Sequence, residues 1–165
     1  MKFLLYFMGL FLIFSAFSVY QVDNDIYLLK QEQLKHIADD CSAAAMLYYD
    51  KDYFGSGVKV FDKTAGNQAI DYILKYDLVE SPKEYFTYYF DGNGKKTTYK
   101  DNKLISEEEG IKYPYQFTEA LTGYKSMVNE PRVIVTINSG DFDYRLTFIN
   151  DQRLIRTSGY EYVGG

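Results

Sequence analysis

The only histidine and the only cysteine of the chain lie five residues apart in the segment LKHIADDCSAAAMLYYD (34–50). Glu32 precedes His36 by four residues, and on a helix this carboxylate could orient the imidazole as a general base. Cys41, however, would lie about 140° further around the helix and would not face His36. Because no nucleophile accompanies the histidine, we interpret His36 as a surface residue and Cys41 as a buried, inert thiol.

The sequence also lacks the residues that other common metal and catalytic sites need. One His and one Cys cannot supply the three or four nitrogen and sulfur ligands of a zinc site. The segment DGNGKK (91–96) resembles the start of a calcium loop, but Asn102 stands where such a loop needs its final Glu, so we predict a hairpin turn. No paired carboxylates, phosphate-binding loop or nucleophile elbow is present. The sequence therefore predicts no enzyme and no metal or other cofactor.

Composition argues against a further class of partner. The 165 residues include 18 Lys and Arg against 23 Asp and Glu, and the net charge of −5 disfavours nucleic acid. The chain also holds 18 Tyr, clustered at 48–49, 85–89 and 113–115. We interpret these clusters mainly as core and cross-strand packing, with a surface for a cell-wall sugar or peptide as the alternative. No small-molecule substrate is evident.

The N-terminus carries a long uncharged run at residues 3–20, FLLYFMGLFLIFSAFSVY. A membrane-spanning helix needs about 20 apolar residues, with a range of about 17–25. Lys2 precedes the run, and Asp23 and Asp25 follow it. This order predicts a single-pass anchor in the cell membrane, with the N-terminus inside and the rest of the chain outside.

A cleaved signal peptide is the alternative. Residues 16–18, Ala-Phe-Ser, fit a cleavage site near Ser18, before Val19, and would give a secreted protein. We favour the retained anchor, because apolar character continues through Tyr20 and no Gly or Pro interrupts the chain near the cut. We therefore assign residues 1–20 to the anchor and 21–50 to an extracytoplasmic helix continuous with it.

Small or apolar residues recur at positions 34, 37, 41, 44 and 48, in steps of three and four that are typical of a helix face. Small side chains allow two helix backbones to approach closely. The predicted helix-packing interface comprises Ala38, Cys41, Ala44 and Ala45. The alternative is that the alanines face the chain's own sheet. We expect Ala38 to contact a neighbouring subunit and Ala45 to contact the head.

Residues 51–165 are expected to form a compact β-rich head packed on the helices. Asp62 is placed to cap a second, shorter helix at about 63–76. Alternating patterns predict strands at 84–90, 95–100, 103–107, 132–138, 142–150 and 153–163, with a short helical region around 116–127. The fold class is therefore α+β, with a twisted antiparallel sheet of about five or six strands. One face should pack on the helices and the other should be more polar.

The expected helix just after the membrane segment contains Leu34-Lys35, Ala38-Asp39-Asp40 and Ala43-Ala44-Ala45. These residues echo a helix motif of the form Leu-Lys-x-Ala-x-Asp-x-Ala-x-x-Ala-Ala. In this respect the chain resembles the membrane-anchored, pilin-like proteins of Gram-positive Tad-type pilus systems, which are related to type IV pili. The specific resemblance covers about a quarter of the chain. It implies a pilin-like structural or assembly subunit at the cell surface. Its partners would be the membrane and, through the N-terminal helix, other pilus or secretion-system subunits.

The sequence departs from the type IV pilin pattern in one respect. Those pilins carry a Gly followed by an apolar stretch with a Glu near its start, whereas Gly9 is followed by LFLIFSAF. This difference favours an unprocessed minor or assembly component over a major pilin. The alternative function is a secreted or tethered binding module that uses a Tyr-rich surface for a cell-wall sugar or peptide.

Overall fold

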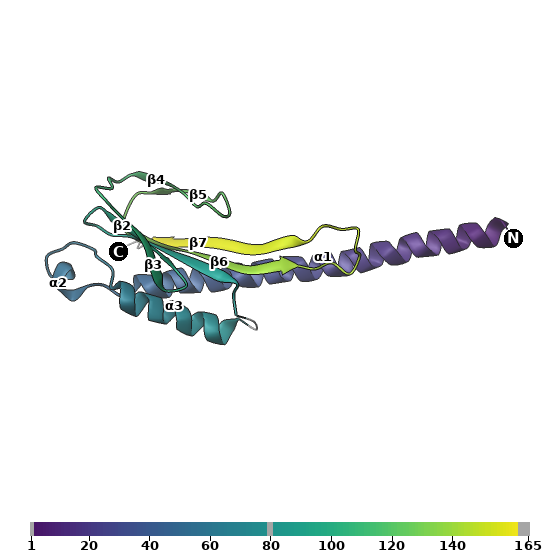
Figure 1. Ribbon diagram of the computed structural model, residues 1–165, viewed down its shortest axis with the longest axis horizontal. Helices are drawn as coiled ribbons and strands as arrows, with labels where there is room; N and C mark the ends of the chain where they lie inside the picture. The colour runs from purple at the N-terminus through teal and green to yellow at the C-terminus, as the bar shows by residue number, and fades with distance from the viewer. Residues whose placement is uncertain (1, 79–80, 162–165) are drawn as a thin grey trace.

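A β-rich head packs against the C-terminal part of one long helix in the computed structural model, which describes residues 2–78 and 81–161 (Figure 1). The helices are α1 (Lys2–Met46), α2 (Lys51–Phe54) and α3 (Lys63–Asp77). The strands are β1 (Glu84–Phe90), β2 (Lys95–Lys100), β3 (Lys103–Glu109), β4 (Tyr115–Thr118), β5 (Lys125–Val128), β6 (Arg132–Phe142) and β7 (Gln152–Glu161). Five strands form an antiparallel sheet in the order β3-β2-β1-β6-β7, and β4 pairs with β5. The predicted α+β class is confirmed.

Side-chain caps explain where the shorter helices begin. Asp62 Oδ1 accepts hydrogen bonds from the backbone N–H groups of Thr64 and Ala65, at 3.1 and 3.0 Å, and so satisfies free donors at the start of α3. Asp50 caps α2 in the same way, because its carboxylate accepts from the N–H groups of Asp52 and Tyr53. The helix α1 ends at Met46, slightly before the predicted boundary at residue 50.

The first hairpins of the sheet follow the local sequence closely. Strands β1 and β2 have the predicted bounds, and β3 extends the predicted strand to Glu109. Between β1 and β2, Gly94 adopts a positive φ of 79°. Between β2 and β3, Asp101 and Asn102 have φ of 47° and 61°, a left-handed conformation that short polar side chains tolerate.

Two predictions for the second half of the chain are wrong. The helical region expected around 116–127 is the β4–β5 hairpin, whose turn is organised by Glu119: its Oε2 accepts the N–H groups of Leu121 and Thr122 at 2.9 and 2.6 Å. The strand expected at 142–150 is instead the end of β6 followed by a loop, which we call the β6–β7 loop (143–151). Its first residues leave the sheet because they pack against α1, as described below.

The face of the sheet opposite the helices is more polar, with residues such as Lys96, Arg132 and Thr136, but it also carries an apolar cluster that is covered. Successive residues of a strand point to opposite faces. Tyr89 and Val135 accordingly join the core between the sheet and the helices α1 and α3. Phe90 and Ile134 join a second core, which the β4–β5 hairpin covers with Phe117.

The tyrosines of β1 are core residues with satisfied hydroxyl groups. The Tyr89 hydroxyl donates to Asn67 Oδ1 at 2.8 Å, and the Tyr88 hydroxyl donates to Glu119 Oε1 at 3.0 Å. Both side chains are buried. This agrees with the packing interpretation of the cluster at 85–89.

We expect Gly66→Ala to lower the free energy of unfolding by ~1–3 kcal/mol, the usual cost of overpacking a core. A Cβ at Gly66 would lie 2.6 Å from the hydroxyl oxygen of the fully buried Tyr89 and 3.3 Å from the Ala45 carbonyl oxygen. Ala is the better helix former by about 1 kcal/mol, so a loss of stability would isolate the steric effect. Urea unfolding of the full chain in detergent micelles, followed by circular dichroism, measures the change.

Gly55→Ala is the matched control for this experiment. Its added Cβ would make an ordinary contact of 3.6 Å with the Lys51 carbonyl oxygen, and its φ of −61° suits alanine. Equal unfolding midpoints for the two variants would contradict the close approach of α3 and β1 at Gly66.

Candidate membrane anchor and helix-packing surface

The N-terminal part of α1 extends beyond the head (Figure 1). Large apolar side chains of the uncharged run, such as Phe3, Phe11 and Phe17, are exposed. In the described part of the chain, α1 is the one helix long and apolar enough to cross a membrane, and no residue of its most apolar window is buried. At 1.5 Å per residue, residues 3–20 span ~27 Å, close to the ~30 Å hydrocarbon core of a bilayer. The orientation and the alternative cleavage near Ser18 stay predictions.

The head meets α1 where the uncharged run ends. The rings of Tyr20 and Tyr144 stack with their centroids 6.1 Å apart. Two turns further along α1, Tyr27 lies against Phe142 at 5.7 Å. The start of the β6–β7 loop is therefore fixed directly above the expected membrane segment.

An ion pair between Asp23 and Arg145 reinforces this junction. Asp23 Oδ1 accepts from Arg145 Nε at 2.7 Å, and Oδ2 accepts from the Arg145 backbone N–H at 3.0 Å. The Asp23 side chain is only 5% exposed, while that of Arg145 is 59% exposed. The sequence identified Asp23 only as an acid beyond the membrane segment, whereas Asp23 in fact joins α1 to the head across 122 positions of sequence.

A second polar contact fixes α1 to the last strand. Gln31 Nε2 donates to the Arg153 carbonyl oxygen and to the Tyr27 hydroxyl oxygen, each at 2.8 Å. Gln31 is buried, although glutamine is usually a surface residue. The contact with Arg153 is not signalled by the local sequence, because Arg153 lies 122 positions later in the chain.

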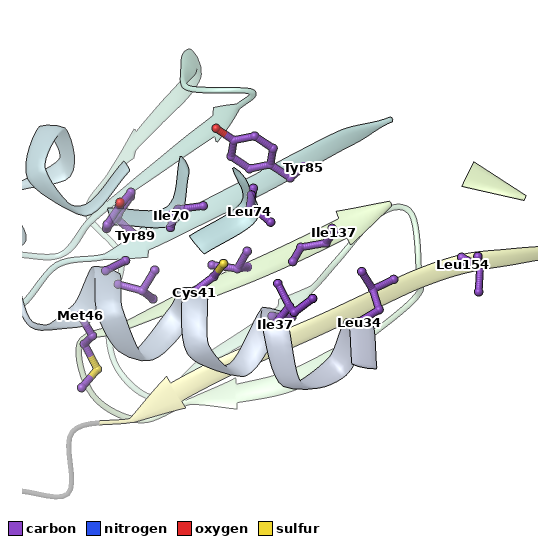
Figure 2. Packing of buried hydrophobic residues seen from close by; sticks show 14 of the residues in the cluster. Leu34, Ile37, Cys41, Met46, Ile70, Leu74, Tyr85, Tyr89, Ile137 and Leu154 are labelled. Atoms are coloured by element: carbon purple, nitrogen blue, oxygen red, sulfur yellow. The ribbon is translucent and has the colours of Figure 1, made fainter. Parts of the chain in front are cut away.

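Three of the four predicted helix-packing residues lie inside the head. Ala38, Cys41 and Ala45 are fully buried in the core, and Ala44 is half-buried. Figure 2 shows Cys41 among residues of α1, α3 and the sheet, including Ile70. The expectation that Ala38 contacts a neighbouring subunit is wrong, because this chain already covers its side chain completely.

The cysteine and the histidine occupy different environments. Burial raises the pKa of the Cys41 thiol from 9.0 to about 12, and the nearby Asp40 carboxylate adds to the shift. At neutral pH the thiol therefore stays protonated and is a poor nucleophile. His36 is on the surface, with its Nε2 3.9 Å from Glu32 Oε1 and both side chains exposed. Both residues are placed as the sequence predicted.

The DGNG turn has a structural role, in which Asp91 connects the sheet to the start of α3. Asp91 is buried, and its carboxylate accepts from the Phe61 N–H at 3.0 Å and from Lys63 Nζ at 2.8 Å. The turn is thereby tied to the start of α3. Within residues 2–78 and 81–161, no group of three or more His, Cys, Asp or Glu side chains is arranged to hold a metal ion.

A line of mostly apolar and exposed residues runs along α1 outside the contact with the head; its two serines are half-buried. Its members recur in steps of three and four, and we call them the uncovered stripe: Leu4, Met8, Phe11, Ser15, Ser18, Val22, Ile26 and Leu29. Val22, Ile26 and Leu29 lie beyond the uncharged run and are 50%, 40% and 65% exposed. Sequence reasoning placed the packing surface at residues 38–45, although the same helical periodicity is present in this earlier stretch.

We expect Ala38→Leu to lower the free energy of unfolding by ~1–3 kcal/mol, because extra methylene groups must enter a filled core. Ala44→Leu is the control, since the half-buried Ala44 side chain has space on its solvent side. Urea unfolding of the full chain in detergent measures both changes. An unchanged midpoint for Ala38→Leu would show that α1 does not pack against the head as described.

Comparison of the chain with protein-family models, with curated proteins and with solved structures gives no match. The arrangement of α1 and the head is therefore the basis on which a function is assigned.

Proposed function

We propose that the chain is a membrane-anchored, pilin-like structural or assembly subunit of a Tad-type pilus system on the surface of a Gram-positive cell. The N-terminus would lie inside, residues 3–20 would span the membrane, and the head would lie outside. The observation that carries the proposal is the uncovered stripe, which continues from the membrane segment into the external part of α1.

The external end of the stripe is the informative part. In a bilayer, the apolar members of the stripe before Val22 would face lipid at no cost, but Val22, Ile26 and Leu29 are exposed outside the expected hydrocarbon core. Fully burying a side chain of this kind contributes about 1.5–3 kcal/mol. A neighbouring helix that follows the stripe would cover all three and gain this energy.

The spacing of the stripe suits a second helix. Steps of three and four residues form the seam along which two helices interdigitate in coiled coils. Ser15 and Ser18 are small enough to let two helix backbones approach within the membrane. The anchor helices of adjacent subunits would therefore pack side by side, with the heads held outside.

The lack of a Glu after Gly9 favours an unprocessed minor or assembly component. The alternative of a sugar- or peptide-binding module has less support from the structure. Tyr85, Tyr88 and Tyr89 are buried in the two cores and are not available to a ligand.

The first test of the proposal is the topology of the anchor. Protease added to intact protoplasts should digest the head and leave an N-terminal fragment in the membrane, because only residues after the span are outside. Immunoblotting with an N-terminal tag and with an antibody to the head measures both parts. A cytoplasmic protein that stays intact controls for lysis. A soluble product in the medium that begins at Val19 would contradict the retained anchor.

The second test measures contact between subunits along the uncovered stripe. Leu29→Cys should give disulfide-linked products in oxidised membranes, because the stripe of one subunit would face the helix of its neighbour. The native Cys41 is fully buried and should not react. Since Leu29 is exposed, the substitution should change stability by no more than about 0.5 kcal/mol.

Thr118→Cys is the matched control for the cross-linking experiment. Thr118 is exposed on β4, on the face of the sheet opposite α1. Non-reducing gels compare the two variants at equal expression. If Leu29→Cys gives no linked product, or if both variants give the same amount, packing along the stripe is wrong.

A further inference from the structure

We infer that the β6–β7 loop is a second membrane contact, in which the exposed Phe148 enters the interfacial layer of the bilayer that α1 spans. The inference rests on the proposed anchoring of α1 and adds to it a lipid-facing surface on the head. It concerns residues that lie about 120 positions after the anchor in sequence and next to it in space.

Contacts with α1 place the loop at the expected membrane surface. Tyr144 stacks on Tyr20, the last residue of the uncharged run, and Arg145 pairs with Asp23. Figure 1 shows the β6–β7 loop at the end of the head that faces the N-terminal part of α1. Since residues 3–20 match the thickness of the hydrocarbon core, the loop lies level with the layer of lipid headgroups.

The tip of the loop offers an apolar side chain to this layer. The Ile149 N–H donates to the Leu146 carbonyl oxygen at 3.0 Å and closes a turn around Phe148. Ile149 packs against the core, but Phe148 is 77% exposed. No other large apolar side chain is more exposed among the described residues outside the uncharged run. Such a side chain gains free energy when it moves from water into the acyl–headgroup boundary.

Neighbouring aromatic residues suit the same layer. Tyrosine rings gather where membrane and water meet, because the ring is apolar and the hydroxyl is polar. Tyr20 on α1 and Tyr144 in the loop form such a pair. Together with Phe148 they would surround the point at which α1 leaves the bilayer.

The loop lacks a cluster of basic residues, which favours an apolar contact with lipid that carries no net charge. The loop carries two acidic side chains, Asp143 and Asp151, and one basic side chain, Arg145; Arg153 follows it in β7. Binding to anionic lipid would need a cluster of basic residues. The contact should therefore form on zwitterionic lipid and should not depend on salt.

The absence of tryptophan makes a direct test available. Three single replacements in the full chain each introduce one selectively excited fluorophore: Phe148→Trp in the loop, Phe17→Trp in the anchor and Phe54→Trp in α2. The helix α2 lies at the opposite end of the head (Figure 1), and Phe54 is also well exposed. Each protein is reconstituted in phosphatidylcholine vesicles that contain lipids with brominated acyl chains, which quench Trp on contact.

We expect quenching and a blue-shifted emission for Phe17→Trp and Phe148→Trp, and neither change for Phe54→Trp. Bromines near the headgroup should quench Phe148→Trp more than bromines deep in the chain do. The quenching of Phe148→Trp should be the same at low and high potassium chloride concentrations, because the contact is apolar.

The alternative outcomes are distinguishable. Quenching of Phe17→Trp without Phe148→Trp would overturn the loop contact and leave the anchor in place. Quenching of neither would overturn both the anchor and the loop contact. Equal quenching of Phe148→Trp and Phe54→Trp would mean that the whole head lies on the bilayer, which overturns a contact specific to the loop. Loss of quenching in high salt would overturn its apolar nature.

Discussion

The close approach of α1 to α3 and the sheet is the interaction on which the rest of the structure depends. Ala38, Cys41 and Ala45 are small enough to bring the α1 backbone against the core, and Gly66 allows α3 to come equally close to Ala45. The same helix continues without a break into the uncharged run at 3–20. The head is therefore packed on a helix whose other half is long and apolar enough to cross a membrane.

Local sequence predicted the elements whose stability is local. The cap at Asp62 marked the start of α3, and alternating residues marked β1 and β2 with their bounds. The segment 142–150 alternates equally well, yet most of it is a loop, because Tyr144 and Arg145 bind α1 instead of a neighbouring strand. Alternation shows that one side of a segment is buried, but it does not show whether a sheet or a helix covers it.

The residues of the candidate site were predictable to different extents. Helical spacing was enough to separate His36 from Cys41 and to identify a small-residue face on α1. It could not decide what covers Ala38, because the covering strands come almost one hundred positions later in the chain. The sequence indicated Asp23 only as an acid after the uncharged run for the same reason, since its partner Arg145 lies 122 positions later in the chain.

The unbroken course of α1 has a mechanical consequence. No glycine or proline follows Gly9 within this helix, so the helix contains no hinge of this kind between the uncharged run and the head. Figure 1 shows β7 running alongside α1, and the contacts of Asp23 and Gln31 lie towards the end of this arrangement that is nearer the uncharged run. A pulling force along the helix axis would load these contacts in shear, so that many must yield together. With a single cysteine and no internal disulfide, the resistance of the protein to tension would come from this sliding geometry rather than from a covalent link.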